Sequence, residues 1–116
     1  MNKVLLVGHL AADPEVRASQ KGTYVARMRL ATNTYAGKAE DGTRKELTQF
    51  HSLVAFGKTA EFSGSYLQKG RLISVEGRLQ TSSWEDAATG QKRYKTEVMV
   101  DELNLVGPKP QESSAA

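Results

Sequence analysis

The alternation of apolar and charged residues over residues 24–31 constrains the fold of this chain more than any other feature. In an extended strand, Ala26, Met28 and Leu30 point to one face of the sheet. Arg27 and Arg29 point to the opposite face. The pattern therefore predicts a half-buried strand, with an apolar face on a core and two arginines on its open face.

Four further segments have strand character and are separated by turn signals. They are residues 2–8, 46–56, 72–80 and 92–106. The turn signals are Asp13-Pro14, an Asp-Gly pair within a polar loop at 36–45, and Thr89-Gly90. Together with residues 24–31, these segments predict five strands.

Residues 58–69 form the one good helix candidate. Phe62 and Tyr66 lie four residues apart on one helix face, and Gly70 follows as the expected C-terminal cap. We expect Phe62 and Tyr66 to lie in the core, together with Tyr24 from the alternating strand.

Five strands with one α-helix between strands 3 and 4 is the element order of the OB-fold barrel, an all-β class. Periodicity alone is equally compatible with another small barrel or a sandwich, and the helix position favours the OB fold. The length fits one domain, which we place at residues 1–107. The Pro- and Ser-containing residues 108–116 are predicted to be a disordered C-terminal tail.

The composition favours a binding protein over an enzyme. Lys and Arg number 16 against 13 Asp and Glu, and the net charge of +3 is compatible with a polyanionic partner. With no cysteine and no His, Asp and Glu cluster at ligand spacing, we predict no metal site and no cofactor. Phosphate-loop and nucleophile-elbow motifs are missing, so no enzymatic activity is expected. The lack of a signal peptide or membrane segment predicts a cytoplasmic protein.

Aromatic and cationic residues together indicate a surface for an unpaired nucleic-acid strand. Bases stack on flat rings whatever their identity, and phosphates are attracted to Lys and Arg. The candidate stacking residues lie in or beside cation-bearing strand segments: Tyr35, Phe50, Phe56 and Trp84. The candidate contacts to the nucleic-acid backbone are Lys3, Arg17, Arg29, Lys58 and Lys69. Trp84 is the strongest of these candidates, because its neighbours are polar and a core position there is improbable.

Short segments in a fixed order resemble the bacterial single-stranded DNA-binding protein family. They are NKVLLVGHL at 2–10, DPEVR at 13–17, LAT at 30–32, VAFGK at 54–58, YLQKG at 66–70, VEGRL at 75–79 and YKTEV at 94–98. Each segment alone is a weak signal, but the ordered set runs from about residue 1 to 107 and is strong.

The resemblance implies an OB fold that assembles as a homotetramer and wraps single-stranded DNA without sequence preference. It implies roles in DNA replication, repair and recombination, in a bacterial cytoplasm and associated with the nucleoid. Family members place stacking aromatics at positions that here hold Phe50, Phe56 and Trp84. Another family aromatic lies one position away from Tyr35.

Two departures from the family pattern are visible. Ser82 and Ser83 precede Trp84 where relatives often have basic residues, so we expect weaker phosphate attraction there. The sequence ends at Ala116 without the acidic tail through which the family recruits replication and repair proteins. Either the sequence is truncated or the protein binds DNA without that recruitment; both alternatives stay open, and recruitment of replication and repair proteins is doubtful.

Three other functions are compatible with the residue pattern alone. An OB-fold replication accessory such as a primosome subunit would bind DNA weakly and act through protein contacts. An enzyme or enzyme subunit would use the barrel mouth for a small ligand. A purely structural domain would bind no oligonucleotide even at low salt.

Overall fold

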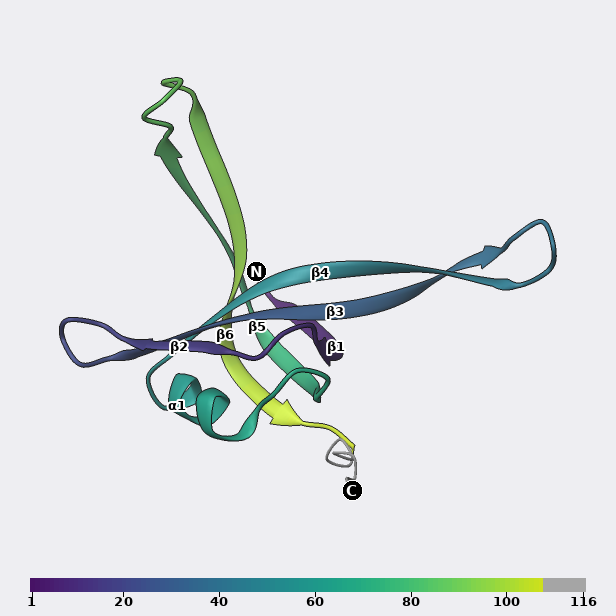
Figure 1. Cartoon of the computed structure of the whole chain (residues 1–116), viewed down its shortest axis with the longest axis horizontal. Helices are drawn as coiled ribbons and strands as arrows, with labels where there is room; N and C mark the ends of the chain where they lie inside the picture. The colour runs from purple at the N-terminus through teal and green to yellow at the C-terminus, as the bar shows by residue number, and fades with distance from the viewer. Residues whose placement is uncertain (108–116) are drawn as a thin grey trace.

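The computed structural model describes residues 1–107, and the predicted tail at 108–116 lies outside the described residues. The chain forms a mostly antiparallel β-structure with one helix (Figure 1). In chain order the elements are β1 Val4–Leu10, β2 Glu15–Ala18, β3 Tyr24–Lys38, β4 Arg44–Phe56, α1 Gly57–Tyr66, β5 Leu72–Glu85 and β6 Lys92–Leu105.

Five of the strands close into a barrel. The sheet order is β1-β5-β6-β4-β3-β2, and an additional pairing of β1 with β3 closes the ring. Among the strand pairs of residues 1–107, only the β4–β6 contact is parallel, at Leu53 with Val98 and Val54 with Met99. Helix α1 lies in the connection between β4 and β5, the third and fourth strands of the barrel. The predicted OB-fold architecture is confirmed.

The barrel interior follows the alternation seen in the sequence. Ala26, Met28 and Leu30 are buried, whereas Arg27 and Arg29 on the same strand are exposed. Inward-facing residues of the other barrel strands complete the core, including Leu10, Leu53, Ala55, Ile73, Val75 and Val98. The inner face of the barrel strands is therefore covered by the core, whereas much of the outer face, apart from positions such as Val54 on β4, is exposed.

Two glycines allow the backbones to approach closely where the barrel closes. A Cβ atom at Gly8 would lie 2.2 Å from the carbonyl oxygen of Ala31 on β3, and one at Gly77 would lie 2.2 Å from that of Met99 on β6. Gly77 also sits at a register shift between β5 and β6. Bulges and glycines at such positions bend strands around a small barrel.

Two hairpins extend beyond the barrel as long two-stranded arms (Figure 1). One arm is formed by β3 and β4, and the other by β5 and β6. The polar loop expected at 36–45 is shorter than predicted, because the pairing of β3 with β4 continues to Lys38 and Arg44. The strand expected at 72–80 likewise continues to Glu85. Cross-strand hydrogen bonds hold these polar segments extended although they have no apolar face.

Strand β2 was not predicted from the sequence. Its four residues, Glu-Val-Arg-Ala, pair with β3 through Ala26 and its neighbours, and Val16 packs against the core from this strand. The turn after β2 is closed by the Ser19 amide donating to the Thr23 carbonyl at 2.7 Å. A segment of four residues is too short to show a clear alternation of apolar and polar residues. It is identified as a strand only by its pairing with β3.

The helix is shorter than predicted, and two expected core residues are exposed. The helix ends at Tyr66 rather than Lys69, because Leu67 is buried in the core and the Gly70 amide donates to the Leu10 carbonyl of β1. Gly70 is therefore a turn residue and not the helix cap. Tyr66 is 67% exposed and Tyr24 is 40% exposed, so their expected core positions are wrong. Phe62 is half-buried against the core.

Candidate nucleic-acid interface

Strand register places three of the predicted stacking residues on one outer face. Residues directly opposite each other in an antiparallel pair point to the same side of the sheet. In the β3–β4 arm, Phe56 is opposite Val25, Phe50 is opposite Ala31, and Tyr35 is opposite Glu46. Along each strand these positions are separated by even numbers of residues. Their side chains therefore all point to the same side of the sheet.

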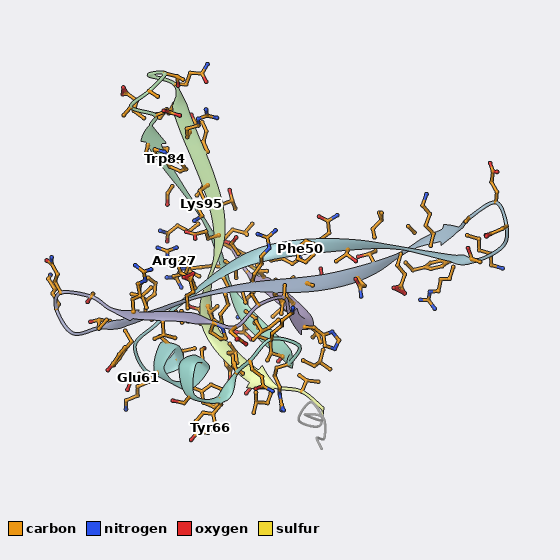
Figure 2. All side chains as sticks on the ribbon, viewed as in Figure 1. Arg27, Phe50, Glu61, Tyr66, Trp84 and Lys95 are labelled. Carbon is orange, nitrogen blue, oxygen red and sulfur yellow. The ribbon has the colours of Figure 1, made fainter. Side chains whose placement is uncertain are left out.

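Neighbouring strands extend this face in both directions. On one side β2 adds Arg17, which is opposite Val25. On the other side Arg27 of β3 contacts Glu97 of β6, and the face continues along β6 to Arg93, which is opposite Trp84. Figure 2 shows Arg27 near the base of the two arms, Phe50 on β4, and Lys95 and Trp84 along the β5–β6 arm.

We call this surface the arm face. It carries the side chains of Arg17, Arg27, Arg29, Tyr35, Phe50, Phe56, Trp84, Arg93, Lys95 and Glu97. Six of the nine predicted site residues therefore share one surface, although they come from four strands.

All four predicted stacking rings are open to solvent. Trp84 is 50% exposed, Phe50 53%, Phe56 49% and Tyr35 52%. Large aromatic side chains usually bury most of their surface, so exposed rings concentrated on one face indicate a binding surface. The arrangement permits base stacking, and the stacking role of each ring stays a prediction.

Cations cover part of two rings. The guanidinium carbon of Arg29 lies 5.0 Å from the centroid of the Phe50 ring. That of Arg44 lies 4.8 Å from the centroid of the Tyr35 ring. Both distances are typical of cation–π contacts. These arginines place a positive charge beside rings that remain half-exposed.

The three rings of the β3–β4 arm are too far apart to clamp one base between them. Phe50 and Phe56 are separated by six residues along β4, which corresponds to about 20 Å in an extended strand. The position of Tyr35 opposite Glu46 is about 13 Å from that of Phe50 by the same measure. Each of these three rings can therefore offer a separate stacking platform along the path of a strand.

Two of the shallow depressions on the arm face lie where the strands meet at the base of the arms. The larger, of about 470 Å³, is lined by Glu15, Arg17, Val25 and Arg27, with Ala18 and Ser19. The smaller, of about 250 Å³, lies where β3, β4 and β6 meet. Its lining includes Arg29, Ser52 and Lys95. Both depressions hold cations and are open to solvent, as expected of a groove that follows a polyanion.

Three predicted backbone contacts lie off the arm face. Lys3 precedes β1, and its ammonium group is 2.6 Å from a carboxylate oxygen of Glu76. Lys58 lies in the first turn of α1, two residues after Phe56. Lys69 follows the helix, and its backbone amide donates to Asp13 Oδ1 at 2.8 Å. Their contacts with DNA stay predictions.

The structure adds cations to the five predicted backbone contacts. Arg27 is expected on the open face of its strand but is not among the five predicted contacts. Arg44 and Lys95 reach the rings and the depression only through the register of long polar arms. A signal for Arg44 existed in the turn at Asp41-Gly42, which predicts a hairpin that brings Arg44 opposite Lys38.

No group of three or more metal-ligating side chains occurs among residues 1–107. Within the same part of the chain, no helix is long and apolar enough to cross a membrane.

Comparisons with known proteins point to one family. The family model described as "Single-strand binding protein family" matches residues 1–106. The "Single-stranded DNA-binding protein 1" of Chlorobaculum tepidum is 44% identical over 109 residues, which is 94% of this chain and 67% of the relative. A solved structure, a Plasmodium falciparum SSB complex with ssDNA, has a TM-score of 0.81 at 27% identity and covers 92% of this chain and 96% of its own. This chain therefore belongs to the single-strand binding protein family.

Proposed function

We propose that this protein binds single-stranded DNA through the arm face, without sequence preference and without catalysis. The observation that carries the proposal is the set of four half-exposed rings interleaved with arginines and lysines on one surface. Stacking on rings accepts every base, and cations attract the backbone phosphates. The bound strand is expected to run along the arms, with bases on Tyr35, Phe50, Phe56 and Trp84.

The comparisons with known proteins support single-stranded DNA as the bound polymer. The Plasmodium structure is described as a complex with ssDNA and shares the fold of this chain. The bacterial relative is named for single-stranded DNA binding. Protection of exposed strands during replication, repair and recombination is the cellular role that we propose, with residues 1–107 as the binding domain. We place it in a bacterial cytoplasm, associated with the nucleoid.

We further propose that the protein assembles as a homotetramer. The outer side of β1 exposes Leu5 by 69% and Val7 by 59%, opposite Glu76 and Ser74 of β5. We call this surface, with Lys3, the β1 face. Exposed aliphatic side chains side by side on a sheet are typical of a surface covered by another subunit. The expected mass in solution is about four times that of the chain, and light scattering after size exclusion measures it.

Titration with oligo-dT at several salt concentrations tests the proposed binding. We expect Trp84 fluorescence to be quenched on binding, because a stacked base contacts the indole ring. The logarithm of the binding constant should fall with log salt at about −0.7 per neutralised phosphate. Failure to bind oligo-dT at low salt would contradict the proposal, and weak binding without quenching would favour a replication accessory.

A further inference from the structure

The carboxylate of Glu97 lies between cations of two strands of the arm face. The Glu97 side chain projects from β6 toward β3, and its Oε2 accepts a hydrogen bond from Arg27 Nη1 at 3.2 Å. The same oxygen lies 3.3 Å from Lys95 Nζ. Among residues 1–107, Glu97 is the one carboxylate that forms ion pairs with two cations. It therefore holds together charges from β3 and β6 at the base of the two arms.

The two partners remain open to solvent while the carboxylate does not. The Arg27 side chain is 60% exposed and Lys95 is 50% exposed, but Glu97 is only 14% exposed. An incoming anion can thus reach both cations without unfolding any element. Figure 2 shows Arg27 and Lys95 close to the point where the arms diverge.

The geometry of these contacts is loose. Charge-assisted hydrogen bonds in proteins are typically about 2.7–2.9 Å long, and both contacts to Glu97 are longer. Both cations contact the same carboxylate oxygen, Oε2. A phosphate also carries several acceptor oxygens and can accept from the guanidinium and the ammonium together. A phosphate can therefore take the place of the carboxylate between these two cations.

Other charges surround the same depression. It is lined by the cations Arg27, Arg29 and Lys95 and by the acids Asp13, Glu15 and Glu97. Asp13 is engaged with the Lys69 amide, and Glu15 lies opposite Arg27 on β2. Glu97 differs from both acids because it neutralises charge from two strands at once.

We propose that Glu97 is an internal competitor of the DNA backbone. In the free protein its carboxylate occupies the place of a phosphate between Arg27 and Lys95, and a bound phosphate displaces it. The inference rests on the proposed function and adds a phosphate subsite to it. The competition lowers the affinity for DNA and reduces its salt dependence, which favours release of the strand.

The test is oligo-dT binding by Glu97→Gln, with Glu61→Gln as the matched control. Both substitutions remove one negative charge, but Glu61 lies on helix α1, away from the arms (Figure 2). If the freed cations neutralise one more phosphate, the slope against log salt becomes steeper by about 0.7. The affinity then rises by about fivefold at 0.1 M salt and hardly at all at 1 M. Glu61→Gln should leave the slope unchanged.

A second variant shows whether the effect passes through the two cations. In the background of Arg27→Met and Lys95→Met, Glu97→Gln should no longer change affinity or slope. Thermal unfolding of each variant confirms that the compared proteins are folded.

Several outcomes would overturn the inference. Unchanged or weaker binding by folded Glu97→Gln would show that the carboxylate does not compete with DNA and only positions Arg27 and Lys95. If Glu61→Gln raised the affinity for oligo-dT by the same factor, the effect would come from the change in net charge and not from the position of Glu97. Failure of the unaltered protein to bind oligo-dT would instead overturn the proposed function and, with it, this subsite.

Discussion

The arm face and the β1 face are both exposed outer surfaces of the same barrel, yet they carry different chemistry. The arm face combines separated flat rings with solvent-exposed arginines and lysines. The β1 face exposes Leu5 and Val7, and its nearby cation, Lys3, is paired with Glu76 at 2.6 Å. Rings with open cations suit stacked bases and phosphates. Branched aliphatic residues beside a neutralised charge suit packing against another protein surface.

Substitution of Leu5→Asp should have the largest effect, and it should fall on assembly. A carboxylate buried in an apolar contact costs several kcal/mol unless it is paired. We expect the tetramer to dissociate into smaller species at micromolar concentration, as measured by analytical ultracentrifugation. Leu47→Asp is the matched control, because Leu47 is exposed on the β3–β4 arm and not on the β1 face. If the Leu5→Asp variant remains a tetramer, the β1 face is not the subunit contact that we propose.

Substitution of Trp84→Ala or Phe56→Ala should reduce the affinity for oligo-dT by one to two powers of ten. Stacking is worth about 1–3 kcal/mol per base, and each ring is half-exposed on the arm face. Tyr66→Ala provides the control, because this ring is also exposed but lies on α1. A loss of the same size for Tyr66→Ala would contradict the assignment of stacking to the arm face.

Substitution of Arg29→Met should have a smaller effect that depends on salt. Loss of one phosphate contact reduces the affinity by about fivefold at 0.1 M salt and flattens the salt slope by about 0.7. Lys3→Met is the informative comparison, since Lys3 is also a predicted backbone contact but is held by Glu76 on the β1 face. An equal change in slope for both variants would extend the DNA path to the β1 face.

The smallest effect concerns the pH dependence of the Lys3–Glu76 pair. The hydrogen bond and the charge of the Glu76 carboxylate raise the pKa of Lys3 above its ordinary value of 10.5. The charged form is thus favoured in the folded protein, so the contribution to stability is present below pH 10.5 and disappears as the pH rises through the raised pKa. An NMR titration of the Lys3 Cε signal measures this value. In Glu76→Gln the pKa should fall, and a pKa that stays raised would refute the pairing.

The sequence predicts the barrel better than the arms. The alternation over residues 24–31 identifies a strand with Ala26, Met28 and Leu30 in the core, because burial on one face leaves a pattern of period two. The arms beyond Tyr35 and Leu79 are exposed on both faces. Their polar residues carry no such pattern, and their extent depends on pairing between distant segments.

The candidate site divides in the same way. Trp84 is predictable because an aromatic residue among polar neighbours stands out in the sequence. Phe50 and Phe56 lie in a strand that also holds Leu53, Val54 and Ala55, and their exposure follows from the strand register. The Arg27–Glu97–Lys95 cluster is not predictable, since it forms only when β6 is placed parallel to β4. Contacts of this kind depend on the order of the strands in the sheet and not on the local sequence pattern, so only the structure can identify them.

NMR of the aromatic ring protons during titration with oligo-dT tests the central claim most directly. Stacked bases shift the protons of a ring they cover upfield. The account predicts such shifts for Trp84, Phe50 and Phe56 and none for Tyr66 on α1. Upfield shifts at Tyr66 with unchanged signals from the three arm-face rings would contradict it.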